Sequence, residues 1–229
     1  MVSGKASSGR AYSVRATIRE RTITTGNAHV PLSFDLEQSL WSRGYGHVAG
    51  LDEAGRGCLA GPVVAGAVIL PQGVTIPGVN DSKKLKAAQR EAVFQTIHSH
   101  ALAVGVGICS PQEVDTLNIL WAAMEAMRRA TANLTPPPDF LLIDGNSVFP
   151  DSPWPYQTVV KGDAHSHTIA AASIIAKVTR DRAMRRLHEA FPVYGWDQNV
   201  GYPTKAHYAA LAQHGPSPHH RRSFRLEAR

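Results

Sequence analysis

Short apolar runs alternate along the chain with longer segments of helical periodicity. Runs that are rich in β-branched residues and bounded by glycine or proline are typical of buried strands. They occur at residues 47–52 (HVAGLD), 62–70 (PVVAGAVIL), 101–109 (ALAVGVGIC), 139–146 (DFLLIDGN) and 156–163 (YQTVVKGD). Helices are predicted over residues 84–100, 110–130, 165–191 and 204–215. Strands interleaved with helices predict an α/β domain whose central sheet is covered on both faces.

Two of the predicted helices carry end signals. Ser110, Pro111 and Glu113 form an S-x-x-E capping box with proline in the first turn, so a helix is expected to begin there and run to about residue 130. Thr204 is the expected cap of the last helix and Gly215 its stop.

Charge is distributed unevenly along the 229 residues, whose formal net charge is +6. Residues 1–30 hold five basic residues against one acidic residue, and residues 219–229 hold four against one. Residues 1–30 also lack a sustained apolar period. We therefore expect a basic, disordered extension at 1–30 and one domain at 31–229 that ends in a basic tail. A surface that tracks nucleic acid and a pair of solvated tails both fit this charge pattern.

Several classes of protein are excluded by composition. Cys58 and Cys109 provide neither a disulfide framework nor the paired spacing of a zinc site. His165 and His167 have no cysteine partners and no HExxH helix, so they are weak evidence for a metal site. No window approaches the ~20 apolar residues of a membrane span, and the first residues lack the apolar core of a secretory signal. We expect a cytoplasmic protein without a membrane partner.

Three aspartates each follow an apolar run: Asp52, Asp144 and Asp163. Because the crevice of an open α/β sheet lies outside the carboxyl ends of its strands, these side chains are expected to meet there. Carboxylates in one crevice repel one another unless a cation neutralises them, and an all-oxygen ligand set selects Mg²⁺ or Mn²⁺. Two such ions about 4 Å apart can clamp a scissile phosphate. Acidic residues at strand ends also serve as ordinary turn formers.

Glu53 and the glycines that follow it raise a separate question. Adjacent strand residues point to opposite faces, so Glu53 can join Asp52 at a metal only if the chain bends there. Gly55 and Gly57 lack Cβ, which allows the backbone between them to approach a ligand closely.

Seven segments, in order, resemble the pattern of ribonuclease HII, the type 2 ribonuclease H: GLDEAGRG, GPVVAGAVIL, DSKKL, LLIDGN, KGDAHSHTIAAASIIAKVTRD, GYPTKAHYAAL and HGPSPHHRRSF. The resemblance covers residues 45–224. It implies a ribonuclease H-like three-layer α/β/α sandwich with a five-stranded mixed sheet, and a monomer. It also implies an endonuclease with two divalent ions, Mn²⁺ or Mg²⁺. Such an enzyme cuts the RNA strand of RNA/DNA hybrids and cuts 5′ to single ribonucleotides embedded in a DNA duplex, leaving 3′-OH and 5′-phosphate ends.

The resemblance also assigns roles to residues. The catalytic acids and metal ligands fall on Asp52, Glu53, Asp144 and Asp163. The loop of Gly55, Arg56 and Gly57 is implied to contact a sugar 2′-OH through main-chain groups, the group that distinguishes RNA from DNA. Tyr202 is implied to pack on the deoxyribose that follows the ribonucleotide. Pro203 departs from the glycine that many members have there, which stiffens the loop.

Basic residues provide candidate phosphate contacts. Lys177 and Arg180 lie three apart on a predicted helix and so share a face. Lys83 and Lys84 in the DSKK segment suit the same contact, although a solvated charged face explains each of these residues equally well.

Three other functions stay open at this point. One is a different nuclease of the same fold, such as a Holliday-junction resolvase. A second is metal-free cleavage in which histidines act as general acid and base on the 2′-OH. A third is a hybrid-binding module without turnover. Metal-dependent cleavage of a ribonucleotide-containing duplex separates all three from the leading hypothesis.

Overall fold

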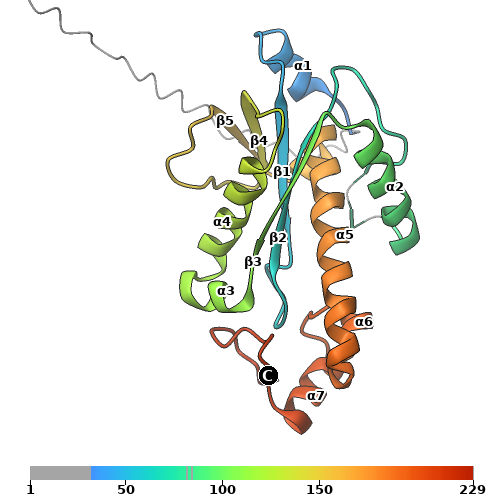
Figure 1. Cartoon of the computed structure of the whole chain (residues 1–229), viewed down its shortest axis with the longest axis vertical. Coiled ribbons are helices and arrows are strands. Elements are labelled where there is room, and N and C mark those ends of the chain that lie inside the picture. The colour runs from blue at the N-terminus through green and yellow to red at the C-terminus, as the bar shows by residue number, and fades with distance from the viewer. Residues whose placement is uncertain (1–31, 81, 84, 229) are drawn as a thin grey trace, which may run out of the picture.

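The computed structural model describes residues 32–80, 82–83 and 85–228 (Figure 1). The extension predicted at 1–30 and the predicted phosphate contact of Lys84 lie outside these residues. Within the described part of the chain, no helix combines the length and apolar character that crossing a membrane requires.

A mixed sheet of five strands forms the centre of the domain. Its strands are β1 (Val48–Ala54), β2 (Val63–Ile69), β3 (Ala103–Cys109), β4 (Phe140–Asp144) and β5 (Tyr156–Val159). They lie in the order β3-β2-β1-β4-β5. β2 is antiparallel to both β1 and β3, whereas β1, β4 and β5 run parallel. The five predicted strands and the mixed sheet are therefore confirmed.

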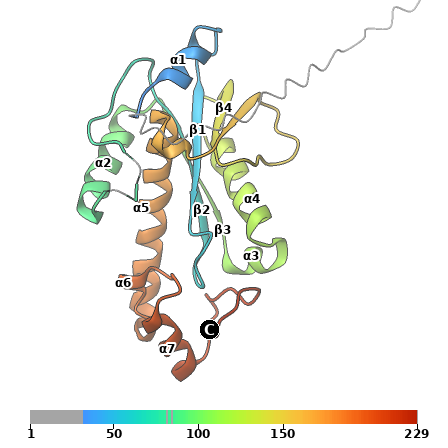
Figure 2. The ribbon, with the colours of Figure 1, turned by 180° about the vertical axis from the view of Figure 1, so that it is seen from behind.

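Helices cover both faces of the sheet (Figures 1 and 2). The helices are α1 (Asp35–Trp41), α2 (Ala87–His100), α3 (Pro111–Leu117), α4 (Ile119–Ala132), α5 (His167–Ala190), α6 (Trp196–Asn199) and α7 (Lys205–His214). α3 and α4 lie on one face, and α5 lies on the other with α2 packed outside it. α6 and α7 continue beyond the end of α5 (Figure 1). The expected three-layer arrangement is present.

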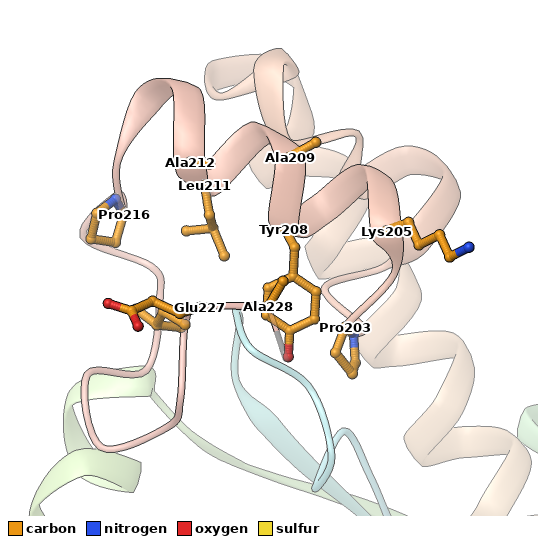
Figure 3. A pocket seen from close by; sticks show the side chains of 10 residues that line it. Pro203, Lys205, Tyr208, Ala209, Leu211, Ala212, Pro216, Glu227 and Ala228 are labelled. Atoms are coloured by element: carbon orange, nitrogen blue, oxygen red, sulfur yellow. The ribbon is translucent and has the colours of Figure 1, made fainter.

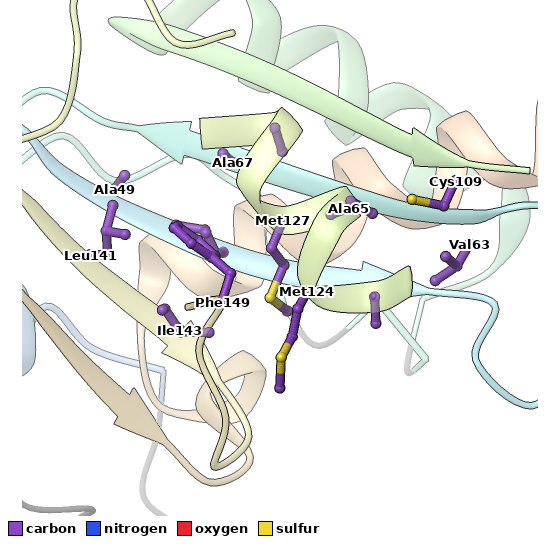
Figure 4. Close-up of a cluster of buried hydrophobic side chains, with 14 of the residues drawn as sticks. Ala49, Val63, Ala65, Ala67, Cys109, Met124, Met127, Leu141, Ile143 and Phe149 are labelled. Carbon is purple, nitrogen blue, oxygen red and sulfur yellow. The ribbon is translucent and has the colours of Figure 1, made fainter. Parts of the chain in front are cut away.

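One apolar core fills the space between the sheet and α4 (Figure 4). Alternate residues of the central strands point into it, as strand geometry requires, including Leu51 of β1 and Ala65 of β2. Met124 and Met127 reach down from α4 between these smaller side chains. Because the opposite residues of the same strands face α5, the two layers bury the central strand β2 along its whole length, whereas the edge strand β3 stays partly exposed.

The predicted helix from Ser110 to about residue 130 is interrupted. Its capping box is confirmed, since Ser110 Oγ accepts from Glu113 N at 3.2 Å and Glu113 Oε2 accepts from Ser110 N at 2.7 Å. The helix ends at Leu117 because Asn118 adopts a positive φ of 63°. The Asn118 side chain then accepts from Leu120 N and Trp121 N, which starts α4 as a separate helix.

The C-terminal segment returns to the sheet after α7. Thr204 and Gly215 bound α7 as predicted, with Thr204 Oγ1 accepting from His207 N at 3.1 Å. Beyond Gly215 the chain forms an isolated bridge between His220 and Ala60, which lies between β1 and β2. Leu59 N also donates to Gly201 O at 2.8 Å. Segments from three distant parts of the sequence therefore meet beyond the end of β1.

The contact between the sheet and α5 depends on a glycine in β2. A Cβ at Gly66 would collide with Ala172 O and lie 3.0 Å from Ala176 N, both backbone atoms of α5. Gly66→Ala is therefore expected to lower the free energy of unfolding by about 1–3 kcal/mol, the usual cost of overpacking a core. Gly46→Ala is the matched control, because its nearest neighbour would be Asp139 Oδ2 at 3.7 Å. Equal midpoints of the two variants in urea denaturation would contradict this packing.

Candidate active site

Parallel pairing of β1 and β4 brings two aspartates side by side. Leu51 is paired with Ile143, so the next residue of each strand is an aspartate, Asp52 and Asp144. Both lie at the carboxyl ends of neighbouring parallel strands, where the sequence predicted the crevice. Asp52 is buried, with a side chain that faces α5, whereas Asp144 is half-buried.

Asp163 reaches this region by a different route from the one expected. β5 ends at Val159, and Asp163 lies in a 3₁₀ turn over Gly162–Ala164 rather than at a strand end. The turn follows Lys161, whose φ of 57° reverses the chain. Gly162 N then donates to Asp144 Oδ1 at 2.7 Å, which ties the turn to β4. Asp163 is thus brought to its neighbours by a backbone reversal, and the predicted strand end is wrong.

The backbone of β1 does not bend at Glu53. β1 stays regular through Ala54, with Glu53 paired to Ala65 of β2, so its side chain starts on the α4 face. Its Oε1 accepts from Arg56 Nη1 at 3.1 Å. Glu53 and Asp144 nevertheless line one hollow below α4, so the two carboxylates approach each other past the end of the strand.

The acids form one electrostatic group. Burial raises the pKa of Asp52 well above its usual range, and the carboxylates of Glu53, Asp144 and Asp163 raise it further. Burial also raises the pKa of Glu53, an effect that Arg56 opposes. Burial, and then the charge of Asp163, raise the pKa of Asp144. The nearby cations compensate this charge only in part, although Lys83 Nζ does lie 2.9 Å from Asp163 Oδ2.

A hard divalent cation fits the donors present. All four side chains offer oxygen atoms only. Burial first, and neighbouring carboxylates second, raise the pKa values of Asp52, Glu53 and Asp144, and a bound cation would relieve the repulsion between these carboxylates. Among the described residues, no three His, Cys, Asp or Glu side chains are already arranged to hold an ion. The fit therefore rests on the chemistry and charge of the donors.

A cleft of about 240 Å³ gathers most of the predicted site residues. Its walls include Asp52, Glu53, Asp144, the 55–57 loop, Lys83, Lys177 and Tyr202. Asp163 and Arg180 do not line it. A larger hollow of about 900 Å³ lies elsewhere, between α7 and the C-terminal segment (Figure 3). That hollow contains none of the four acids.

The two glycines of the loop differ in what they allow. Gly55 has a φ of 96°, and a Cβ there would collide with the side chain of Arg180. A Cβ at Gly57 would meet nothing within 4 Å. Gly55 is therefore needed to shape the loop, whereas Gly57 leaves open space on the side of the cleft.

Arg180 is not placed for the phosphate contact that its helical spacing suggested. It is fully buried, and its nitrogens donate to the carbonyls of Pro62, Ala60 and Val200 at 2.9–3.0 Å. These carbonyls belong to the segment after the 55–57 loop and to the segment before Tyr202. Arg180 therefore holds the two segments together.

Arg221 has a similar role that the sequence did not reveal. It is also fully buried, with Nε donating to Gly61 O and Nη1 donating to Arg56 O, each at 3.0 Å. The second bond fixes the backbone of the 55–57 loop from the C-terminal segment. In the sequence Arg221 stands beside Arg222 in a basic tail, and no local signal separates the buried arginine from the exposed one.

Tyr202 lies at the mouth of the cleft with 40% of its surface exposed. Lys177 Nζ lies 5.6 Å from the centre of its ring, and Arg180 Cζ lies 5.9 Å from it. Lys177 also donates to Asp181 Oδ1 at 2.7 Å, so its ammonium group is already oriented. The structure places both Tyr202 and Lys177 in the wall of the cleft.

The loop geometry gives a paired prediction. Gly55→Ala is expected to lower the free energy of unfolding by about 2 kcal/mol or more, since a positive φ alone costs an L-residue about 1–2 kcal/mol and the new Cβ also displaces Arg180. Gly57→Ala is expected to change that free energy by less than about 0.5 kcal/mol. Thermal and urea denaturation of both variants provide the measurement. A Gly57 variant that is as unstable as the Gly55 variant would contradict the open space at Gly57.

Comparison with known proteins identifies the family. The sequence model of ribonuclease HII matches residues 49–227. Ribonuclease HII from Salinibacter ruber is 59% identical over 193 residues, which cover 83% of this chain and 96% of that protein. Ribonuclease HII from Geobacter sulfurreducens is 53% identical over 195 residues, which cover 85% and 89% of the two chains.

Solved structures agree on the fold. The crystal structure of ribonuclease H2 from Pyrococcus horikoshii superimposes with a TM-score of 0.65 at 30% identity, covering 78% of this chain and 94% of that chain. Bst ribonuclease HIII in complex with Mn²⁺ superimposes with a TM-score of 0.56 at 18% identity, covering 74% and 63%, and shows the ribonuclease H-like fold alone. From its sequence and its architecture together, the chain belongs to the ribonuclease HII family, which comprises endoribonucleases that act on RNA/DNA hybrids.

Proposed function

We propose that this protein is a divalent-metal-dependent endonuclease that cuts 5′ to ribonucleotides, both in the RNA strand of RNA/DNA hybrids and at single ribonucleotides in duplex DNA. The observation that carries the proposal is the shared cleft. Asp52 and Asp144 lie in it together with the 55–57 loop and Tyr202, so a cutting centre and two candidate reading elements adjoin. The products are 3′-OH and 5′-phosphate ends.

The four acids would hold the metal. Asp52 and Asp144 are central, since they directly follow the last paired residues of two adjacent parallel strands, while Glu53 and Asp163 approach from either side. Two Mg²⁺ or Mn²⁺ ions would activate the attacking water and stabilise the leaving oxygen. Lys83 would assist by orienting the Asp163 carboxylate through their 2.9 Å ion pair.

The 55–57 loop would recognise the ribonucleotide. Gly57 leaves open space beside the backbone, which gives a sugar 2′-OH access to main-chain groups. Arg221 holds the Arg56 carbonyl, so these main-chain groups are fixed before substrate arrives. A fixed loop favours binding because less conformational entropy is lost.

Tyr202 would read the next sugar along the strand. Its half-exposed ring lies at the mouth of the same cleft and can pack against a deoxyribose. A deoxyribose has no 2′-OH that would hold the sugar away from the ring. Lys177, beside this ring, would face the adjoining phosphate. The 55–57 loop and the Tyr202 ring together would therefore locate an RNA-to-DNA junction. The protein would act as a monomer.

Metal-free histidine chemistry is less well supported by the site. His167 Nε2 accepts from Ile76 N at 3.1 Å, and burial lowers the His167 pKa to about 4. Among the residues that the structure describes, no histidine lines the cleft. A general acid and base would have to act within that cleft, where the carboxylates lie.

Cleavage of a DNA duplex with one embedded ribonucleotide tests the proposal. Asp52→Asn and Asp144→Asn are each expected to lower the metal-dependent rate by roughly a thousandfold or more, because bound metal supplies several kcal/mol of transition-state stabilisation. Glu189→Gln is the matched control, since Glu189 is an exposed acid of α5 away from the cleft. Rates are measured with Mg²⁺, with Mn²⁺ and with excess chelator, and the cut ends are mapped.

Full activity in chelator, or cyclic phosphate products, would instead indicate histidine chemistry. Wild-type rates in both aspartate variants would show that the acids do not form the catalytic centre. Faster cleavage of branched DNA than of the ribonucleotide-containing duplex would indicate a resolvase.

A further inference from the structure

Two histidines outside the cleft are buried against each other behind Tyr202. His207 of α7 and His220 of the C-terminal segment are 0% and 1% exposed, with their Nε2 atoms 3.0 Å apart. Two ring nitrogens at this distance share one proton, so one ring donates and the other accepts. The hydrogen-bond partners of the other ring nitrogens determine which histidine is the donor and which is the acceptor.

The contacts of His220 assign its proton to Nε2. Its Nδ1 lies 3.0 Å from Ser217 N, a backbone group that can only donate, so Nδ1 is the acceptor. A neutral ring with an unprotonated Nδ1 carries its hydrogen on Nε2. His220 therefore donates to His207 Nε2.

The opposite tautomer follows for His207. Its Nε2 accepts from His220 and also from Trp196 Nε1, a donor only, at 3.2 Å. Its hydrogen is therefore on Nδ1, which lies 2.9 Å from the backbone carbonyl of Tyr202. The chain of bonds thus runs from Ser217 through both histidines and ends on Tyr202.

The backbone that leads to Tyr202 has an unusual conformation. The preceding Val200 adopts a φ of 41°, unusual for a β-branched residue, and Gly201 a φ of 85°. The half-exposed ring itself has a side-chain hydrogen bond with Cys58 and lies beside Lys177 and Arg180, so the bond from His207 acts on the backbone that carries the ring. Two backbone hydrogen bonds complete the anchoring of Tyr202: its carbonyl also accepts from Thr204 N at 2.9 Å, and its N donates to Asn199 O at 2.8 Å.

We propose that His207 is a positioning residue for ribonucleotide recognition: its Nδ1–H holds the Tyr202 carbonyl, while Trp196 and His220 fix the tautomer that makes this bond possible. The inference rests on the proposed role of Tyr202 at the junction. His207 touches neither the cleft nor the acids, so it acts through Tyr202 alone.

Burial keeps both rings neutral, as the arrangement requires. It lowers the pKa of His207 below its usual value and that of His220 to about 4, with the charges of His207 and Arg222 adding to the effect on His220. A second proton on either ring would place N–H against N–H. The bond to Tyr202 is therefore intact at neutral pH.

Two substitutions of His207 separate the bond from the packing. His207→Asn places an amide N–H near the Nδ1 position and keeps the donor to Tyr202, whereas His207→Gln places its amide near Nε2 and loses that donor. The readout is kcat/KM for a duplex with one ribonucleotide divided by kcat/KM for a uniform RNA/DNA hybrid. His207→Gln is expected to lower this ratio about fivefold, the equivalent of one hydrogen bond, and His207→Asn to keep it within about twofold.

A double-mutant cycle and a packing control complete the test. In a Tyr202→Ala background, His207→Gln is expected to change the ratio no further. Leu211→Ala removes another buried side chain of α7 without touching Tyr202, and is expected to lower the unfolding midpoint but not the ratio. All assays are run below the lowest unfolding midpoint of the set.

The outcomes distinguish the two claims. A wild-type protein with no metal-dependent cleavage of either substrate would overturn the proposed function, whatever the variants do. If wild type cleaves and Tyr202→Ala lowers the ratio while His207→Gln leaves it unchanged, the positioning role is wrong and the function stands. An equal loss in His207→Gln and Leu211→Ala would show a merely structural role, which also overturns the inference.

Discussion

Mutual repulsion of carboxylates at one edge of the sheet is the constraint on which the site depends. The parallel pairing of β1 with β4 places Asp52 beside Asp144, and the turn after β5 adds Asp163. Burial beneath α5 prevents water from screening Asp52, so its carboxyl is held far from its usual pKa. A sheet covered on both faces provides the rigidity that keeps these groups together against their repulsion.

Buried cations act on the neighbouring backbone more than on the acids. Arg180 and Arg221 are fully buried, yet the hydrogen bonds described for them end on carbonyl oxygens rather than carboxylates. Burying a guanidinium group is costly unless its donors are satisfied. All three nitrogens of Arg180 donate to carbonyls, whereas Nη2 of Arg221 is buried without a partner among the described residues. Their bonds join the 55–57 loop, the segment before Tyr202 and the C-terminal segment. The elements proposed to recognise the substrate are thereby set relative to the acids before any substrate binds.

The sequence predicted the strands and the acids because local patterns determine both. Apolar runs mark buried strands, and Asp52 and Asp144 directly follow such runs. Asp163 was wrongly expected at a strand end, since a positive φ at Lys161 leaves no sequence signal. The break at Asn118 was missed for the same reason. Helical spacing placed Arg180 on the same helix face as Lys177, but it did not show that the Arg180 side chain is buried. The contact between His207 and His220 was not predicted because it depends on tertiary packing.

The unfolding midpoint of wild type and of Asp52→Asn, measured against pH in chelator and in Mn²⁺, tests the central claim most directly. Folding raises the pKa of the Asp52 carboxyl. Such a group contributes to stability at pH values below its pKa in the unfolded chain, and that contribution is lost as the pH rises through its pKa in the folded protein. In chelator at pH 8 the variant is therefore expected to be more stable than wild type, by about 1 kcal/mol, with the difference vanishing below about pH 4. Mn²⁺ is expected to raise the wild-type midpoint more than that of the variant. A variant that is less stable than wild type at pH 8 in chelator, with equal responses of both to Mn²⁺, would contradict the account.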